Sequence, residues 1–436
     1  MVFDDLSLGL VKQIFPESRR PDVPATLAKE FARTDLIQKI RPGQRVVVTS
    51  GSRGIESMLE VVSSLVRLIR ERGAEPVVLP AMGSHGGGTP QGQAEVLAHL
   101  GQTEETLGAK ILKDYKPKVI GQVFDGLPVS VDAQILKEET DHVILVGRVK
   151  EHTEFIGPIE SGLLKMAVVG LGRVEGATMM HQAAVTRTYY RTIVEMAKVI
   201  FGAAPVLGGV ALIEDERNVL KHLEVVPTDK ILEREPELLA KSKETRAKLP
   251  FDELDVLLVD EMGKNFSGTG IDTKVVGRIM NIYEQEPTTP KITRIVTFKM
   301  SPKGGGNAIG IGINDFVTRK LFEAVDPRMT DLNATVAVSP EKGRCPLVRE
   351  DAAGALAGAL ATIGPWRSPE LKMVWIPNTK DLEYLAVSPK LYLLAKERPG
   401  LELIAEPTPL PFLPDQYFEP FAEWLEKRRR EVAAKP

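Results

Sequence analysis

The alternation of apolar runs with amphipathic runs is the feature that most limits what this chain can fold into. Val-, Ile- and Leu-rich runs that end in glycine or polar residues predict buried strands at 44–51, 75–83, 141–151 and 205–215. Between them, apolar residues recur at helical spacing over 55–73, 89–101 and 176–202. Strands that alternate with helices are typical of a parallel sheet with helices on its faces. We therefore predict an α/β fold with largely parallel sheets.

The pattern is interrupted between residues 216 and 253, where Lys, Glu and Arg dominate. This segment is typical of an exposed helix that leads to a hinge near 245–253. The alternation then restarts, with predicted strands at 254–263, 291–301 and 371–378. A chain of 436 residues is long enough for two or three domains. We predict two α/β domains, 1–249 and 250–436, with the last segment packing back on the first domain.

Composition excludes several classes of protein. The net charge of −3 gives no electrostatic reason to expect a nucleic-acid partner. The single cysteine excludes an internal disulfide and a cysteine-based zinc site, and fits a reducing compartment. No run approaches the ~20 apolar residues of a membrane span, and the N-terminus is a poor signal peptide. We expect a cytoplasmic protein without a nucleic-acid or membrane partner, while the oligomeric state stays open.

Reactive side chains follow three predicted strands at the point where each strand ends. Arg53, His85 and His152 occupy these positions. Because ligands of parallel sheets bind outside the carboxyl ends of the strands, these residues are candidates for one site. His85 lies in the run "GSHGGGTPQG", where glycine implies a tight turn or close approach of the backbone to a bound molecule. The sequence leaves both interpretations open, and a histidine in a polar loop, such as His152, can also be a simple surface residue.

Two further residues stand out downstream. Lys165 lies in the apolar run "SGLLKMAVVGLG", where burial of a charged amine is costly. Its side chain either extends to water or does chemistry, such as carrying a covalent group. His181, beside Met179 and Met180 in a predicted helix, has a structural role more often than a metal-binding one. The glycine runs "GLGRVEG", "SGTG" and "KGGGNAIGIG" match turns as well as anion-binding loops.

Taken in order, these segments resemble those of the nickel-dependent lactate racemase family, whose members act on 2-hydroxy acids. The resemblance rests on "SRGIES", "MGSHGGGTPQGQ", "KEHTEFIGPIESGLLKM" and "MMHQAA", and extends over roughly residues 40–280. It implies two α/β domains with the active site in the cleft between them. It also implies a nickel-pincer nucleotide, the nickel complex of pyridinium-3,5-bisthiocarboxylic acid mononucleotide. Enzymes that build this cofactor are then required partners.

The resemblance also implies a role for each matching residue. Lys165 matches the lysine to which the cofactor is tethered, and His181 matches the protein ligand of the nickel. His85 and His152 match the two general acid/bases. Substrate binding is implied for Arg53 and Lys274, and contact of the backbone with the cofactor is implied for Gly86, Gly87 and Gly172.

These residue types suit racemisation by proton-coupled hydride transfer. Removing the Cα proton beside a carboxylate would leave a poor carbanion, whereas moving a hydride to the cofactor gives a 2-keto acid that can be reduced on either face. An imidazole with a pKa near ~6.5 can take and return the hydroxyl proton, and two imidazoles serve the two enantiomers. A guanidinium binds a carboxylate with two parallel hydrogen bonds. The resemblance, with which these residue types agree, therefore implies a nickel-dependent isomerase, a racemase or epimerase of a 2-hydroxy acid.

The chain departs from the lactate racemase pattern in segments predicted to border the substrate. Ser-Gly-Ser-Arg at 50–53 replaces Asp-His-Thr-Arg, and Thr-Glu at 153–154 replaces an aromatic pair. These changes predict a larger or more polar 2-hydroxy acid than lactate. Two other function classes stay open: a non-catalytic protein that binds a hydroxy acid or nucleotide, and a metal-dependent hydrolase with His85, His152 and His181 as ligands.

Overall fold

The computed structural model of the protein describes residues 3–52, 55–83 and 85–434. The chain divides into two compact units, one of residues 18–246 and one of residues 1–17 together with 247–436. Each unit has its own main sheet. Along the chain the first unit ends at Arg246, close to the predicted hinge.

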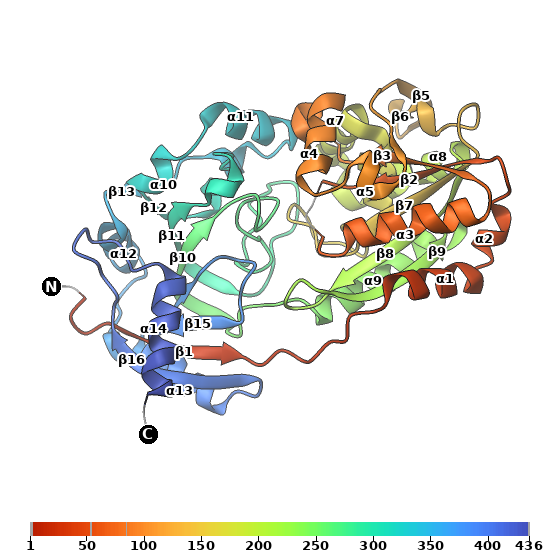
Figure 1. The fold of residues 1–436 in the computed structure, drawn as a ribbon. Helices are drawn as coiled ribbons and strands as arrows, with labels where there is room; N and C mark the ends of the chain where they lie inside the picture. The colour runs from red at the N-terminus through yellow and green to blue at the C-terminus, as the bar shows by residue number, and fades with distance from the viewer. Residues whose placement is uncertain (1–2, 53–54, 84, 435–436) are drawn as a thin grey trace. The chain divides into compact units, whose positions relative to one another are not determined.

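The unit of residues 18–246 is built on a six-stranded sheet (Figure 1). In spatial order its strands are β4 (Lys110–Ile111), β3 (Glu75–Pro80), β2 (Arg45–Ser50), β7 (His142–Arg148), β8 (Val206–Glu214) and β9 (Leu220–Pro227). The first five run parallel, and β9 is antiparallel to β8. A separate hairpin consists of β5 (Pro117–Val123) and β6 (Leu127–Asp132). The prediction of a largely parallel sheet is confirmed.

Helices cover both faces of this sheet. They are α1 (Val23–Arg33), α2 (Leu36–Lys39), α3 (Met58–Glu71), α4 (Pro90–His99), α5 (Glu104–Leu107), α6 (Leu163–Lys165), α7 (Leu171–Arg187), α8 (Tyr189–Ala203) and α9 (Ile231–Glu244). Successive strand residues point to opposite faces, so Val46 packs with α1 and α3 while Val47 packs with α7, α8 and α9. Apolar residues on both faces explain why β2 is a continuous apolar run.

The helix predicted over 176–202 is not continuous. It is divided into α7 and α8 at Thr188, which has a φ of 65°. Such a φ is unfavourable for a β-branched residue and ends α7, while the Thr188 hydroxyl accepts the N–H of Arg191 and begins α8. A second bend lies at Arg173, where φ is 51° and ψ is −137°, just after a π-helical turn over Met166–Gly170. The chain from 163 to 203 therefore changes direction twice.

The second unit contains an eight-stranded sheet. In spatial order its strands are β13 (Leu347–Arg349), β12 (Phe316–Thr318), β11 (Lys291–Met300), β10 (Glu253–Met262), β14 (Met373–Ile376), β15 (Tyr384–Val387), β1 (Ser7–Gln13) and β16 (Leu401–Pro409). The five strands from β13 to β14 are parallel, and the last three form antiparallel pairs. Its helices are α10 (Arg319–Glu323), α11 (Pro327–Val336), α12 (Ala352–Leu360), α13 (Pro389–Glu397) and α14 (Phe421–Ala433).

The N-terminal segment corrects the predicted assignment of residues 1–249 to one domain. Leu10 of β1 pairs with Ala386 of β15 on one side and with Ala405 of β16 on the other. Residues 1–17 thus complete the sheet of the second unit, and β16 and α14 also belong to that unit. The residues that pair here are separated by nearly the whole length of the chain. The segment "LSLGLVKQ" is equally typical of a strand in either sheet, so the sequence does not indicate to which unit it belongs.

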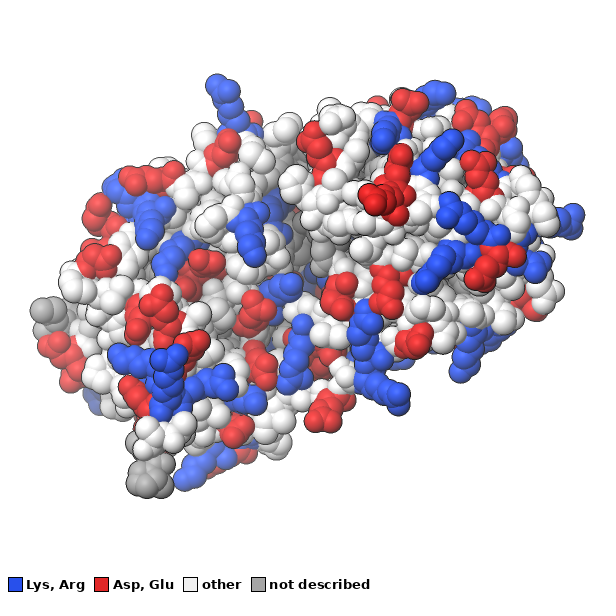
Figure 2. All heavy atoms as spheres, viewed as in Figure 1, with Lys and Arg blue, Asp and Glu red and all other residues white. Residues whose placement is uncertain are grey.

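Two surface properties agree with the composition. Lysine and arginine are interspersed with aspartate and glutamate on the face shown in Figure 2, as the similar counts of 56 basic and 59 acidic residues suggest. Within the described ranges, no helix has both the length and the apolar character that a membrane crossing requires.

Candidate functional site

The candidate site begins where the strand order of the six-stranded sheet reverses. From β2 the chain proceeds to β3 and β4 on one side, whereas β7 lies on the other side of β2. Ligands of open parallel sheets bind at this reversal, outside the carboxyl ends of the strands. The loop after β2 carries Ser52, the loop after β3 carries His85, and the loop after β7 carries His152. Fold topology therefore directs three polar loops to one edge of the sheet.

His85 is anchored through one ring nitrogen. Its Nδ1 forms a hydrogen bond with the hydroxyl of Ser52, which joins the loops after β2 and β3. The backbone of His85 accepts the N–H of Gly88 and donates to the carbonyl of Met82, so the loop turns tightly around this residue. His85 itself is partly exposed. The hydrogen bond at Nδ1 leaves Nε2 as the nitrogen oriented for other contacts.

The structure gives the neighbouring glycines packing roles. Gly86 has a φ of +65°, and a Cβ there would lie 2.5 Å from the carbonyl carbon of Gly92 in α4. A Cβ on Gly172 would lie 3.0 Å from the carbonyl oxygen of Ser130 in β6. Gly87 also has a positive φ, of +66°, but faces open space. Close packing within the protein thus explains why Gly86 and Gly172 have no side chain, without any contact to a ligand. At Gly87 only the positive φ favours glycine.

His152 lies in a loop that is closed at its base and organised around a buried carboxylate. Lys150 and Ser161 exchange two backbone hydrogen bonds of 2.9 and 3.1 Å. Inside the loop, the carboxylate of Glu160 accepts the backbone N–H of His152 at 2.7 Å and also binds Nζ of Lys243 in α9 at 2.9 Å. His152 is 7% exposed, and its Nδ1 accepts the backbone N–H of Glu154 at 3.1 Å. Both the loop and the ring orientation are therefore fixed.

Lys165 ends the short helix α6 and points at His152. Its Nζ lies 2.9 Å from Nε2 of His152. The start of α6 rests on Glu235 of α9, whose Oε2 accepts the N–H of Leu164 at 3.0 Å. Burial raises the pKa of Glu235 to about 8, and the N–H groups of Leu163 and Leu164 offset this only in part. The lysine that the sequence placed in an apolar run thus reaches a polar partner instead of lying alone in the core.

An aromatic side chain links His152 to His181. Tyr189, the first residue of α8, lies with its ring 6.2 Å from that of His152 and 5.9 Å from that of His181, centroid to centroid. Phe155 stacks on Tyr189 at 5.2 Å with an interplanar angle of 5°. The break at Thr188 makes this arrangement possible, because a continuous helix would carry Tyr189 two turns beyond His181 along the same axis. His152 and His181 thus lie against the same tyrosine ring, and Lys165 contacts His152.

A buried ion pair lies at the bend between Lys165 and His181. Arg173 is 1% exposed, and its guanidinium lies 3.5 Å from a carboxylate oxygen of Asp132 and over the ring of Tyr115. The Tyr115 hydroxyl donates to the carboxylate of Glu175, on the other side of the bend. Burial raises the pKa of Asp132 and of Tyr115. A non-glycine residue held at this φ stores strain, which commonly occurs next to functional sites.

Three predictions concern residues or groups that this cluster does not contain. Arg53 lies outside the described residues. Lys274 lies in the other unit, in the loop between β10 and β11, where it is buried and its N–H donates to Asp272. His85, His152 and His181 do not form a three-histidine metal site, since no group of three histidine, cysteine, aspartate or glutamate side chains in the described ranges is arranged to hold a metal ion. The ligand set proposed for a hydrolase is therefore wrong.

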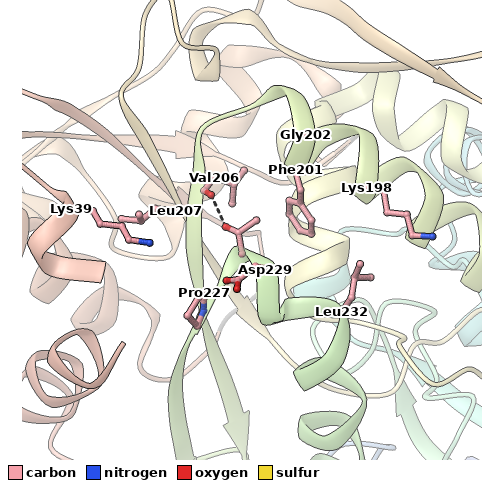
Figure 3. Close-up of a pocket in the computed structure, with 10 residues that line it drawn as sticks. Lys39, Lys198, Phe201, Gly202, Val206, Leu207, Pro227, Asp229 and Leu232 are labelled. Carbon is pink, nitrogen blue, oxygen red and sulfur yellow. Dashed lines mark hydrogen bonds between the residues drawn. The ribbon is translucent and has the colours of Figure 1, made fainter. Parts of the chain in front are cut away.

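A pocket of about 600 Å³ lies at the opposite end of the same sheet (Figure 3). Val206 at the start of β8, Pro227 at the end of β9, and Lys198, Phe201 and Asp229 line it, and Thr228 donates a hydrogen bond to the Val206 carbonyl. The pocket thus opens at the amino end of β8, away from the strand ends that carry Ser52, His85 and His152. Its lining includes Lys198 and Asp229 but no histidine. We therefore place the candidate site at the strand ends that carry the histidines, and not at this pocket.

Sequence reasoning missed three supporting residues. Glu160 and Glu235 lie in segments that are polar in composition, and Tyr189 lies in the middle of the helix predicted over 176–202. Glu235 could have been found, because it shares a helical face with the apolar residues Ile231 and Leu238. Nothing in the sequence indicates that Glu160 folds back on the backbone of His152 or that the helix breaks before Tyr189.

Comparisons with known proteins add a similarity of fold. No protein-family model and no curated protein matches the sequence. Among solved structures, the chain is similar to the lactate racemase apoprotein from Thermoanaerobacterium thermosaccharolyticum, with a TM-score of 0.47 and 12% sequence identity. The similarity covers 98% of this chain and 96% of that chain. At this level of identity, only the side chains of this protein can support an assignment of function.

Proposed function

We propose that the protein is a racemase or epimerase of a 2-hydroxy acid that uses a nickel-pincer nucleotide attached to Lys165. The observation that carries this proposal is the 2.9 Å contact between Lys165 Nζ and His152 Nε2, beside the Tyr189 ring that also contacts His181. A group able to form a covalent tether, a general acid/base and a metal ligand of the expected types are thus neighbours within one unit. The order of the sequence motifs supports the same assignment.

The residues present fit a metal that brings most of its own ligands. The described side chains offer no three-residue metal site, so a bare ion would be poorly held. A nucleotide that holds nickel through its own atoms needs a single protein ligand, and a neutral imidazole such as that of His181 suits nickel. The amine of Lys165 suits attachment to a thiocarboxyl group. When bound, this cofactor would supply the acceptor for the hydride from Cα of the substrate.

The two histidines are prepared for proton transfer in the same way. Nδ1 of His85 is bonded to the Ser52 hydroxyl, and Nδ1 of His152 accepts the N–H of Glu154. In both rings Nε2 is therefore the nitrogen that would face the substrate hydroxyl once the cofactor occupies Lys165. Arg53 is proposed to hold the substrate carboxylate, and Lys274 to contribute from the second unit. Two bases with equivalent nitrogens suit a reaction that accepts either enantiomer.

Co-expression with the enzymes that build the cofactor tests this proposal. We expect a mass increment on the peptide that contains Lys165, bound nickel, and interconversion of the enantiomers of a 2-hydroxy acid in a panel followed by chiral chromatography. His85→Phe should lose interconversion and keep nickel, while His99→Phe, on the exposed end of α4, should behave like the parent protein. A protein without adduct and nickel refutes the proposal. Adduct and nickel without exchange would favour the non-catalytic binding protein.

A further inference from the structure

The hydrogen bonds of His152 fix where its ring proton lies. The backbone N–H of Glu154 donates to Nδ1 at 3.1 Å. A neutral imidazole has one N–H and one acceptor nitrogen, so an Nδ1 that accepts leaves the proton on Nε2. The ring proton of His152 therefore points toward Lys165.

The contact with Lys165 then restricts the charge of the lysine. An Nε2–H can donate only to a lone pair, and Nζ of Lys165 lies 2.9 Å from Nε2. An ammonium group has three donors and no acceptor, so a protonated Lys165 would oppose one N–H with another. Protonating the ring instead would place a hydrogen on Nδ1, against the N–H of Glu154. These two contacts are satisfied together when both the imidazole and the amine are neutral.

Neighbouring groups hold both partners in this orientation. The His152 ring packs against Phe155 at 4.8 Å between centroids, and its backbone N–H is held by Glu160. Lys165 belongs to the turn whose Leu164 N–H donates to Glu235. Glu235 and Lys243, which pairs with Glu160, both belong to α9, so one helix supports the histidine and the lysine together.

We propose that His152 holds Lys165 as a neutral amine and so makes Lys165 the site at which the chain is acylated. An exposed lysine with an ordinary pKa near 10.4 is neutral in roughly one molecule in 2,500 at pH 7, and only the neutral amine is nucleophilic. The inference rests on the proposed function in one respect, namely that the acyl group taken up in the cell is the thiocarboxyl group of the cofactor. In that condensation the N–C bond forms, the C–OH bond breaks, and the hydroxyl leaves as water with a proton from the amine.

The same contact implies an order of events for His152. Once acylated, the nitrogen of Lys165 no longer offers a lone pair, so the Nε2–H of His152 loses its acceptor. The ring is then left to hydrogen-bond with a substrate hydroxyl. In the chain without cofactor, the imidazole is instead engaged with the lysine.

Competitive acetylation tests the proposal without cofactor or nickel. The purified chain is treated at neutral pH with a trace of acetic anhydride, and the acetylation rate of each lysine is measured by peptide mass spectrometry. We expect Lys165, although only partly exposed, to react at least tenfold faster than the exposed Lys110. In His152→Phe, which keeps an aromatic ring against Phe155, the rate at Lys165 should fall at least tenfold and the rate at Lys110 should not change.

The outcome is independent of the racemase assay. Lys165 reacting more slowly than Lys110 in the parent chain, or equally fast in the parent and in His152→Phe, overturns the inference whatever the cofactor experiment gives. His99→Phe serves as the matched control and should leave all rates unchanged. If circular dichroism shows that His152→Phe is unfolded, His152→Gln provides the same comparison with a smaller polar side chain.

Discussion

Glu235 offers the sharpest test of how α9 supports the site. This glutamate is 1% exposed, contacts the start of α6 and has a pKa raised to about 8 by burial. Glu235→Gln keeps the size of the side chain and an oxygen that can accept the N–H of Leu164. Because glutamine cannot ionise, the variant has no negative charge at this buried position at any pH. The substitution therefore isolates the cost of that charge from the packing of α9.

The expected effect depends on pH, with a sign that follows from the raised pKa. Between the ordinary value of 4.5 and about 8, the folded chain keeps a proton on Glu235 that the unfolded chain releases. The contribution of Glu235 to the free energy of unfolding is therefore fully present below pH 4.5. It is lost as the pH rises through this window. At ~1.4 kcal/mol per pH unit, the loss reaches roughly 5 kcal/mol above pH 8. Glu235→Gln should be close to the parent at pH 5 and more stable by up to that amount at pH 9.

Urea unfolding at a series of pH values measures this difference, and the tryptophans provide an internal reference. Trp366, Trp375 and Trp424 all lie in the unit formed by 1–17 and 247–436, whereas Glu235 lies in the other unit. Tryptophan fluorescence therefore follows the second unit, and far-ultraviolet circular dichroism follows both. The dichroism transition should lose its pH dependence in Glu235→Gln. The fluorescence transition should shift only to the extent that the two units unfold together.

Glu237→Gln is the matched control, two residues further along α9 with a side chain that is 63% exposed. It should show the same slope of stability against pH as the parent chain. The reasoning is refuted if Glu235→Gln and the parent lose stability in parallel between pH 5 and pH 9, because Glu235 would then be ionised in the folded chain at no cost.

The remaining predictions concern other positions in the same unit. Arg173→Met leaves the buried carboxylate of Asp132 without its cation and should lower the free energy of unfolding by about 3–5 kcal/mol in urea titrations; a loss below ~1 kcal/mol would show that the pair is not needed. Gly86→Ala should destabilise more than Gly87→Ala in thermal unfolding, since both have positive φ but only the first Cβ would meet another backbone; equal midpoints would contradict this. Hydrogen bonds from His222 and Arg234 lower the pKa of Glu224 to about 2, so Glu224→Gln should lose stability at neutral pH and show a weaker fall of stability as the pH drops from 4.5 toward 2.

The sheet of the first unit could be predicted because its signals are local. Residues 44–51 and 141–151 are apolar runs that fill a strand buried on both faces, and the observed β2 and β7 end within three residues of the predicted limits. The position of His85 and His152 at strand ends follows from the same pattern. Membership of β1 in the other unit could not be predicted, because it depends on pairing with residues nearly four hundred positions away.

The shape of the site around Lys165 was hidden for a different reason. It depends on backbone conformations that local preference opposes: a φ of 51° at Arg173 and of 65° at Thr188. A sequence pattern reports what a segment prefers, so "GATMMHQAAVTRTYYRTIVEMAKVIFG" predicts one uninterrupted helix. Tertiary contacts decide otherwise, and the partner of each bend lies on a different element, such as Asp132 on β6 for Arg173.

These departures from local preference are concentrated in one part of the fold. The π-helical turn over 166–170, the bends at Arg173 and Thr188 and the buried Glu235 all lie on the helical path from Lys165 to Tyr189 or directly beneath its start. Each is unfavourable in isolation, and a helix without them would be more stable. A straight helix, however, rises ~1.5 Å per residue and would carry His181 about 24 Å from Lys165. The strained path instead brings both residues to the rings of His152 and Tyr189, which is what a tethered group that also needs a histidine ligand requires. Strain concentrated along the path that produces this geometry is the physical reason to place function here.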